Sequence, residues 1–357
     1  MKKLLLLVAM AILIGMFVSG GYALAGSESK ANVKTITLNY AAVNPMTGFE
    51  GKVFQWAFDE VEKRTEGRVK IQVFPSGTLL GFKEQLEGVQ RGAADIGNIS
   101  GAWFPKQVPY EAIINTPTFA PNAEWIRQTT NWVKAYWDYW DSTPALRDEM
   151  KRWKQTIWVA VPFGPYDIFS KVMLNSLEDF KGIRIRAVGL KAEYLFSPFK
   201  AIPVNIRPPE VYSAMQKGIC EAAFVGIAWG DDYGIAEVSP YLIKTSGSYG
   251  GSLRTLALSA LDKMTPADRE TFMAIGRELS YRYAKAVDER ETQLLKKYKD
   301  AGMVIKDFPA DQREKWMNTC EKNVYKAFLE ANKDVPNIRE LFKKWLTTIG
   351  APQLMPE

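Results

Sequence analysis

The order of extended and helical segments in the first hundred residues constrains the fold more than any other feature. "TITLNYAA" (35–42) alternates as a strand does, and "RVKIQVFPSG" (68–77) contains a second strand that ends at a Pro-Ser-Gly turn. Between them, apolar residues recur at helical spacing, and a second helix and a short strand in "ADIGNIS" (94–100) follow. This strand–helix–strand–helix–strand order predicts an α/β fold with largely parallel pairing.

A later segment repeats part of this pattern. "EQLEGVQRGAAD" (84–95) and "EVYSAMQKGICE" (210–221) each carry a Glu, a Gln six residues later, then a base, a Gly and an acid at matching offsets. In both, the Gly can end the helix in a left-handed conformation. The repeat predicts two lobes of related construction.

The segment 265–302 predicts one long helix. Thr265 can cap it, Pro266 fits the first turn, Asp268 completes a capping box and Gly302 follows the last turn. At about 1.5 Å per residue, such a helix reaches about 50 Å, which is enough to brace two lobes. Two helices broken near Gly276 are the alternative.

The first 25 residues differ from the rest of the chain. Lys2 and Lys3 precede an apolar run, and small residues at Ala23 and Ala25 offer a cleavage site. We expect a secretory signal peptide cut after Ala25, and therefore an exported, periplasmic protein. An uncleaved membrane anchor is the alternative, although the run is shorter than the roughly 20 residues that a span needs.

Charge and composition exclude several classes of function. The net charge is +6, and it falls to +4 without the two leader lysines, so we expect no nucleic-acid partner. The chain has no histidine, which excludes Ser-His-Asp catalysis and histidine metal sites. Cys220 and Cys320 have no zinc-type spacing, and the sequence leaves their pairing open. We expect no metal and no cofactor.

One predicted strand, "GIRIRAV" (182–188), carries two arginines on the same face. Strands inside an α/β sheet are usually apolar on both faces. The segment is therefore an exposed edge, or at least one arginine binds an anion.

Several spaced segments together resemble one family. "EVEKRTEGRVKIQVFPSGTLLGFKEQLEGVQRGAADIG", "LEDFKGIRIRAVG", "IPVNIRPPEVYSAMQKGICEA" and "WGDDYGIAEVSPYLI" resemble, in matching order, the TRAP-transporter solute-binding proteins, which are the DctP-like periplasmic subunits. The resemblance covers roughly residues 35–303.

The resemblance implies a two-lobed periplasmic binding protein fold, class II-like, with a hinge and a long bracing helix. It implies one lobe from 33–163 plus about 252–291, and a second from 164–251 plus about 292–357. It also implies a small-molecule carboxylate as ligand and the membrane subunits of a TRAP permease as partner. We expect a monomer.

In the family, the arginine at the end of the "GIRIR" strand pairs with the ligand carboxylate, which by resemblance is Arg186. An interdomain salt bridge is the alternative role, and we expect Arg184 to be solvated or salt-bridged. Many relatives carry a second arginine upstream, where this chain has Tyr166. Phe224 and Val225 stand where keto-acid-binding relatives carry metal-binding residues, and where sialic-acid relatives carry an asparagine.

Aromatic residues dominate the segments expected to reach the ligand. The candidates for ligand contact, besides Arg186, are Tyr166, Phe224 and Trp229, then Phe163, Trp103, Phe104 and Tyr249. A place in the core is the alternative for each of them. Asn44, Glu50 and Asp231 are candidates for the far end of the ligand, with turn and cap roles as alternatives.

These residues favour a non-enzymatic solute-binding protein that closes on a monocarboxylate with an apolar or aromatic body. A C4-dicarboxylate or a 2-keto acid is the alternative ligand. A ligand sensor and an exported enzyme on the same fold are the alternative functions.

Overall fold

A computed structural model describes residues 35–116, 119, 121–187, 192–206 and 210–356 of the chain. The expected signal peptide, residues 1–25, lies outside the described residues.

The first of two sheets contains five strands in the order β2-β1-β3-β10-β4. The strand β1 pairs in parallel with β2 and β3, whereas β10 is antiparallel to both β3 and β4. The bounds are β1 (Ile36–Ala41), β2 (Val69–Phe74), β3 (Ile96–Ile99), β4 (Gln155–Pro162) and β10 (Gly251–Ala257).

The second sheet contains six strands in the order β11-β9-β5-β8-β6-β7. Here β6 lies parallel to both β7 and β8, β11 lies parallel to β9, and β5 is antiparallel to β8 and β9. The bounds are β5 (Tyr166–Ser170), β6 (Arg184–Arg186), β7 (Ile202–Val204), β8 (Ala222–Gly226), β9 (Tyr241–Lys244) and β11 (Val304–Asp307).

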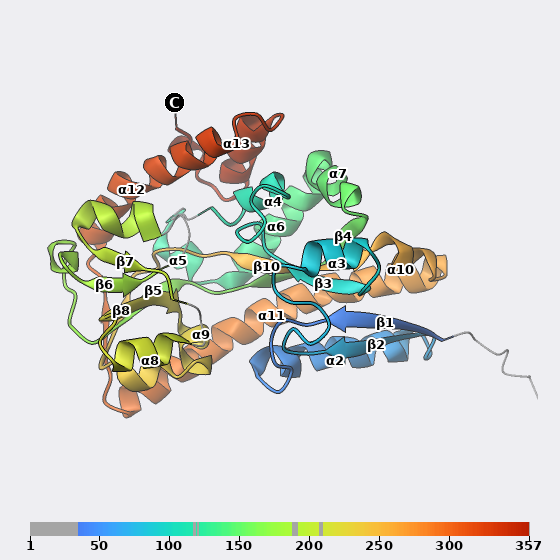
Figure 1. Ribbon diagram of the computed structural model, residues 1–357, viewed down its shortest axis with the longest axis horizontal. Coiled ribbons are helices and arrows are strands. Elements are labelled where there is room, and N and C mark those ends of the chain that lie inside the picture. The colour runs from blue at the N-terminus through green and yellow to red at the C-terminus, as the bar shows by residue number, and fades with distance from the viewer. Residues whose placement is uncertain (1–34, 117–118, 120, 188–191, 207–209, 357) are drawn as a thin grey trace, which may run out of the picture. The chain divides into compact units, whose positions relative to one another are not determined.

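Helices of very different length accompany the sheets (Figure 1). They are α2 (Phe49–Arg64), α3 (Gln85–Gln90), α4 (Pro109–Ile113), α5 (Ala123–Ile126), α6 (Thr129–Ser142), α7 (Pro144–Arg152), α8 (Val211–Gln216), α9 (Ile227–Asp232), α10 (Leu258–Asp262), α11 (Pro266–Asp300), α12 (Ala310–Ala331) and α13 (Ile338–Thr348). Within the described ranges, no helix combines the length and apolar character that a membrane crossing requires.

The predicted α/β class and its first strands and helices are confirmed, but the pairing is more mixed than the sequence suggests. The antiparallel strands β5 and β10 are those that enter from the other sheet, since β4 leads into β5 and β9 into β10. Parallel neighbours such as β1 and β2 are joined by a helical crossover, whereas β5 and β10 each come directly from a strand of the other sheet and run against their neighbours. The sequence pattern of a strand does not reveal this direction.

The two predicted helix ends of the internal repeat are also confirmed. Gly92 and Gly218 both adopt the left-handed conformation, with φ of 79° and 70°, after α3 and α8. Each helix is followed by a buried strand, β3 and β8 respectively. The repeat therefore supplies one strand to each sheet.

The long helix α11 is continuous from Pro266 to Asp300, so the alternative of a break near Gly276 is wrong. Thr265 caps it by accepting a hydrogen bond from the backbone N–H of Asp268. A Cβ at Gly276 would lie 2.2 Å from the backbone oxygen of Trp158, so glycine allows the helix to approach β4 closely. Because α11 packs on α2 and β4, and also on α9 and β11, it contacts elements of both sheets (Figure 1).

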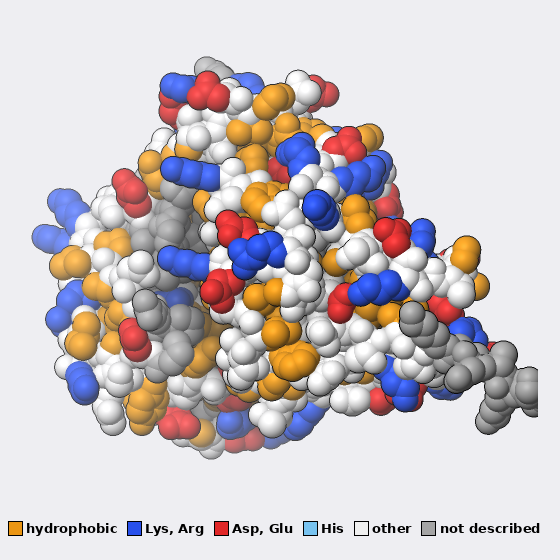
Figure 2. All heavy atoms as spheres, turned by 45° about the vertical axis from the view of Figure 1, so that its right-hand side comes forward, with side chains coloured by type: hydrophobic (Ala, Val, Ile, Leu, Met, Phe, Trp, Pro, Cys, Tyr) orange, Lys and Arg blue, Asp and Glu red, His pale blue; other side chains and the backbone are white. Residues whose placement is uncertain are grey.

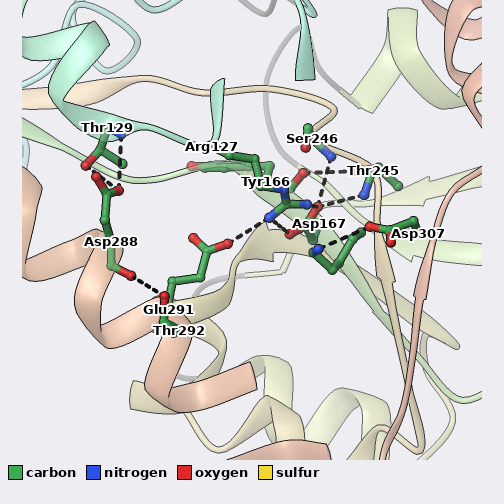
Figure 3. A network of polar contacts seen from close by, with 11 residues as sticks. Arg127, Thr129, Tyr166, Asp167, Thr245, Ser246, Asp288, Glu291, Thr292 and Asp307 are labelled. Carbon is green, nitrogen blue, oxygen red and sulfur yellow. Dashed lines mark hydrogen bonds and ion pairs between the residues drawn. The ribbon is translucent and has the colours of Figure 1, made fainter. Parts of the chain in front are cut away.

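A buried ionic network joins the segment after α5 and a strand of the second sheet to α11 (Figure 3). Arg127, just after α5, donates to both carboxylate oxygens of Asp167 on β5, at 2.8 and 2.9 Å, and to Glu291 on α11 at 2.7 Å. Asp167 is fully buried, and one of its oxygens also accepts from the backbone N–H groups of Thr245 and Ser246. This network fixes the strand that begins with Tyr166.

The charges in this network depend on one another. Burial raises the pKa of Glu291 to about 7, against the lowering effect of Arg127. Burial alone would lower the pKa of Arg127, but Asp167 and Glu291 raise it overall. Removal of one partner would leave an uncompensated buried charge.

We predict that Asp167→Asn lowers the free energy of unfolding by about 3–5 kcal/mol. The substitution removes the carboxylate that accepts two hydrogen bonds from the Arg127 guanidinium. Asp307→Asn is the matched control, since the Asp307 side chain is 83% exposed and pairs only with Lys244 among the described residues. Urea unfolding of both variants measures the difference. Equal stability losses would contradict a structural role for the network.

A second buried acid lies away from the network, in α4. Glu111 is fully buried, and its Oε2 has no hydrogen-bond partner among the described residues. Burial, with the nearby Glu149 carboxyl, raises the pKa of Glu111 well above its ordinary value. The folded state then holds this proton more tightly than the unfolded state, so the contribution of Glu111 to stability declines as the pH rises above about 4.5.

We predict that Glu111→Gln, which cannot ionise, gains stability relative to the wild type as the pH rises from about 5 to about 8. Thermal melts across this range measure the gain, and Glu314→Gln, on the exposed face of α12, is the control. A Tm difference that stays constant with pH would contradict the burial of an uncharged Glu111.

Candidate functional site

A cavity of about 610 Å³ is lined by residues from elements of both sheets. The first sheet and the helices near it contribute the 43–50 segment, Asn98, Val161 and Ser252. The second contributes Arg186 and the segment around β8 and α9. Since these residues come from widely separated parts of the chain, the fold is needed to bring them together.

Arg186 is the most unusual residue of this cavity. It lies at the carboxyl end of β6, which is paired on both sides, and only 5% of it is exposed. Its Nε donates to the backbone oxygen of Ile206 at 3.1 Å, and its Cζ lies 5.0 Å from the centroid of the Trp229 ring. In the part of the chain that the structure describes, no residue hydrogen-bonds to its two terminal nitrogens and no carboxylate pairs with it. Burial lowers its pKa.

The other charged side chains of the cavity are neutralised by the protein. Glu50 pairs with the buried Arg254 at 2.5 Å, and Arg290 pairs with Asp232 at 2.5 Å. Figure 2 shows acidic and basic side chains interspersed over one outer face, without a broad area of one sign. Among the described lining residues, the unbalanced charge of the cavity is therefore the single positive charge of Arg186.

Seven of the residues predicted for ligand contact line this cavity. Arg186 and Trp229 contact each other, as described above, and Trp103 packs on Phe82 with ring centroids 3.8 Å apart. Burial raises the pKa of Tyr166, which Arg186 partly offsets. The seven are Asn44, Glu50, Trp103, Phe163, Tyr166, Arg186 and Trp229.

The other four lie outside the lining. Phe224 is 1% exposed and packs on Phe196 and Trp316 in the core, whereas its neighbour Val225 lines the cavity, because successive side chains of β8 alternate between faces. Phe104 and Tyr249 are also buried in the same core.

Asp231 faces away from the cavity. It accepts from Arg290, Lys297 and Tyr298, and it lines a separate polar hollow beside the end of α11. Its neighbour Asp232 lines the main cavity instead. The sequence analysis selected Asp231, whereas Asp232 is the acid of this segment that lines the main cavity.

Several lining residues were missed by sequence reasoning. They include Phe49, Phe82, Asn98, Tyr233, Ser252 and Tyr283. A signal existed for Asn98, because it is a polar residue in a short strand, Ile96–Ile99, that is buried throughout. Ser252 and Arg254 are likewise polar residues of a strand that is buried throughout.

The remaining predicted features can be placed as well. Arg184 is exposed and pairs with Glu221, which confirms the expected salt bridge. Cys220 and Cys320 are buried and free, so they do not form a disulfide with each other. The described residues contain no group of three or more acids and cysteines arranged to hold a metal ion.

Comparison with known proteins is consistent with this arrangement. Residues 44–331 match the family model DctP, "Bacterial extracellular solute-binding protein, family 7". A solute-binding protein of Albidiferax ferrireducens is 24% identical over 290 residues, which cover 80% of this chain and 83% of the relative.

Solved structures share the fold. A TRAP periplasmic solute-binding protein of Desulfovibrio salexigens, in an open complex, superposes with a TM-score of 0.78 at 24% identity, covering 90% of this chain and 98% of that one. A second protein of this organism, with bound orotic acid, gives a TM-score of 0.74 at 17% identity, covering 88% and 99%. The two sheets with their connecting segments correspond to the two-lobed fold of these proteins.

The family model covers most of the chain, and the match spans 83% of the Albidiferax ferrireducens relative and 98% of the open-complex structure. Proteins of this family bind solutes outside the cytoplasm and work with TRAP permeases. The chain belongs to the DctP family of bacterial extracellular solute-binding proteins, and its fold is that of a TRAP periplasmic solute-binding protein.

Proposed function

We propose that this protein captures an organic monocarboxylate with an apolar or aromatic body and delivers it to a TRAP permease. The observation that carries the proposal is the buried guanidinium of Arg186, which lines the cavity without a described carboxylate partner. A guanidinium binds a carboxylate by two parallel hydrogen bonds, and the terminal nitrogens of Arg186, which have no hydrogen-bond partner among the described residues, suit that geometry.

The charge balance of the cavity supports a single negative charge on the ligand. Glu50 and Asp232 are each neutralised by an arginine, so the described lining has no second unpaired cation for another carboxylate. A buried charge without a partner is costly, so one carboxylate restores neutrality and a second would disturb it.

The walls of the cavity support an apolar or aromatic ligand body. The aromatic side chains that line the cavity include Phe82, Trp103, Phe163, Trp229 and Tyr233. The ring centroids of Trp229 and Tyr233 lie 4.5 Å apart. Aromatic faces of this kind suit stacking on a planar ring. Orotic acid, which the second Desulfovibrio salexigens protein binds, is a planar ring that carries one carboxylate.

The proposed mechanism is closure of two lobes on the ligand. One lobe comprises 33–163 with about 252–291, and the other comprises 164–251 with about 292–357. Arg186 fixes the carboxylate from the second lobe, and aromatic side chains from both lobes cover the rest. Ligand favours closure because it binds the closed state better.

A C4-dicarboxylate or a 2-keto acid is the alternative ligand, and it requires a second polar anchor beside Arg186. A ligand sensor would use the same cavity but hand its signal to a receptor, and co-purification with membrane proteins separates it from a transport subunit. An exported enzyme would consume its ligand, whereas a binding protein returns it unchanged in stoichiometric amount.

The first experiment is a thermal-shift screen of refolded protein without bound ligand. Native-state binding raises stability by RT ln(1 + [L]/Kd), about 2.7 kcal/mol at a hundredfold excess over Kd. We predict clear shifts with benzoate, phenylacetate or cinnamate, and none with benzamide, which lacks the charge. Shifts confined to succinate, malate or pyruvate would contradict the proposed ligand class.

We predict that Arg186→Ala weakens binding of the best of these acids at least tenfold, because truncation of a buried charged partner costs about 2–5 kcal/mol. Arg184→Ala is the matched control, since this arginine lies two residues away and pairs with Glu221 outside the cavity. Isothermal calorimetry measures both affinities. An unchanged affinity in Arg186→Ala would exclude the carboxylate anchor.

A further inference from the structure

The cavity has a second polar feature, on the first sheet, and it is organised by Arg254. This arginine is fully buried on β10 and uses its donors on four partners. Nε donates to the Tyr40 hydroxyl at 2.7 Å, Nη1 to Asn98 Oδ1 at 3.1 Å and to Ser252 Oγ at 2.8 Å, and Nη2 to Glu50 Oε1 at 2.5 Å.

The strand geometry explains why these groups meet. Arg254 and Asn98 are directly opposite each other in the antiparallel pair of β10 and β3. Ser252 lies two residues from Arg254 and therefore on the same face of β10. Glu50 comes from the first turn of α2 and is held in turn by Asn44, whose Nδ2 donates to Glu50 Oε2 at 2.8 Å.

Arginine has only donors, so Arg254 fixes which way its partners face. The Asn98 oxygen must point to Arg254, and the amide Nδ2 must point away from it. Asn98 lines the cavity, and Nδ2 has no hydrogen-bond partner among the described residues, yet it is not sealed off from open space. The Ser252 hydroxyl accepts from Arg254, which leaves its proton free to donate into the cavity that it also lines.

These two donors carry no net charge with them. Glu50 neutralises Arg254, so the wall as a whole is neutral and has no net charge to attract a second anion. Paired neutral donors beside a balanced ion pair suit an uncharged oxygen. A ligand hydroxyl could accept from Asn98 or Ser252, whereas a plain hydrocarbon would leave both donors unpaired at a cost in free energy.

We infer that Asn98 and Ser252, oriented by Arg254, form a subsite for an uncharged oxygen acceptor at the end of the ligand remote from its carboxylate. The inference rests on the proposed function, since it assumes that Arg186 holds the carboxylate. It refines the ligand class to monocarboxylates that bear a hydroxyl or carbonyl oxygen on an apolar or aromatic body. Arg254 is a positioning residue in this subsite, and it does not touch the ligand.

The test compares matched probes that differ in one acetyl group, whose oxygen can only accept a hydrogen bond: benzoate with 4-acetylbenzoate, phenylacetate with 4-acetylphenylacetate, and cinnamate with 4-acetylcinnamate. The three probe lengths sample three separations between the carboxylate and the second oxygen. By calorimetry, the wild type is expected to prefer the oxygenated member of at least one pair by about tenfold, or about 1.4 kcal/mol.

Asn98→Asp keeps the oxygen that faces Arg254 but removes the donor, and Ser252→Ala removes the second donor with little change in volume. In each variant, the ratio of the affinity for the oxygenated probe to the affinity for the unsubstituted probe is expected to fall toward one, while the unsubstituted probe still binds. Asn175→Asp, whose side chain accepts from Lys306 outside the cavity, is the control and should keep the wild-type ratio. A loss of folding alone would weaken both probes equally and leave the ratio unchanged.

The outcomes separate the two proposals. Equal affinities within every pair for the wild type would overturn the subsite and leave the monocarboxylate proposal intact. A preference that persists in both Asn98→Asp and Ser252→Ala would also overturn the subsite. If no aromatic acid binds at all, the proposed ligand class fails and the subsite fails with it.

Discussion

A buried guanidinium with no described carboxylate partner is the constraint on which the interpretation of this protein depends. Removal of a cation from water is costly, and Arg186 recovers only part of that cost from the Ile206 carbonyl and the Trp229 ring. Its strand is held on both sides by β7 and β8, so the side chain has a fixed origin at the edge of the cavity. A ligand carboxylate bound in the cavity would supply the missing partner of the Arg186 guanidinium.

The other buried arginines show what the fold does when a charge serves structure. Arg127 joins Asp167 and Glu291, and Arg254 joins Glu50 with three neutral acceptors. Both are satisfied within the chain, and both lie in positions that order the surroundings of the cavity. The first fixes β5 to α11, and the second orients Asn98 and Ser252. The contrast with Arg186 separates structural arginines from the one that we assign to ligand.

Much of this architecture could be predicted from sequence, because local patterns determine it. The first strands, the helix-ending glycines and the continuous helix α11 follow from periodicity and capping residues. The roles of Phe224 and Val225 could not be separated, since β8 is buried on both faces and both residues are apolar. Asn98 and Ser252 could not be assigned to the site from sequence, because their role depends on their positions beside Arg254. The register between β3 and β10 sets these positions, and local sequence does not reveal it.

The most direct test of the account is a crystal structure of the protein with a bound aromatic monocarboxylate. We predict that both carboxylate oxygens lie within about 3 Å of the terminal nitrogens of Arg186, with the ring among the aromatic side chains of the cavity. A carboxylate bound elsewhere, with Arg186 paired instead to a carboxylate of the protein itself, would contradict the central claim.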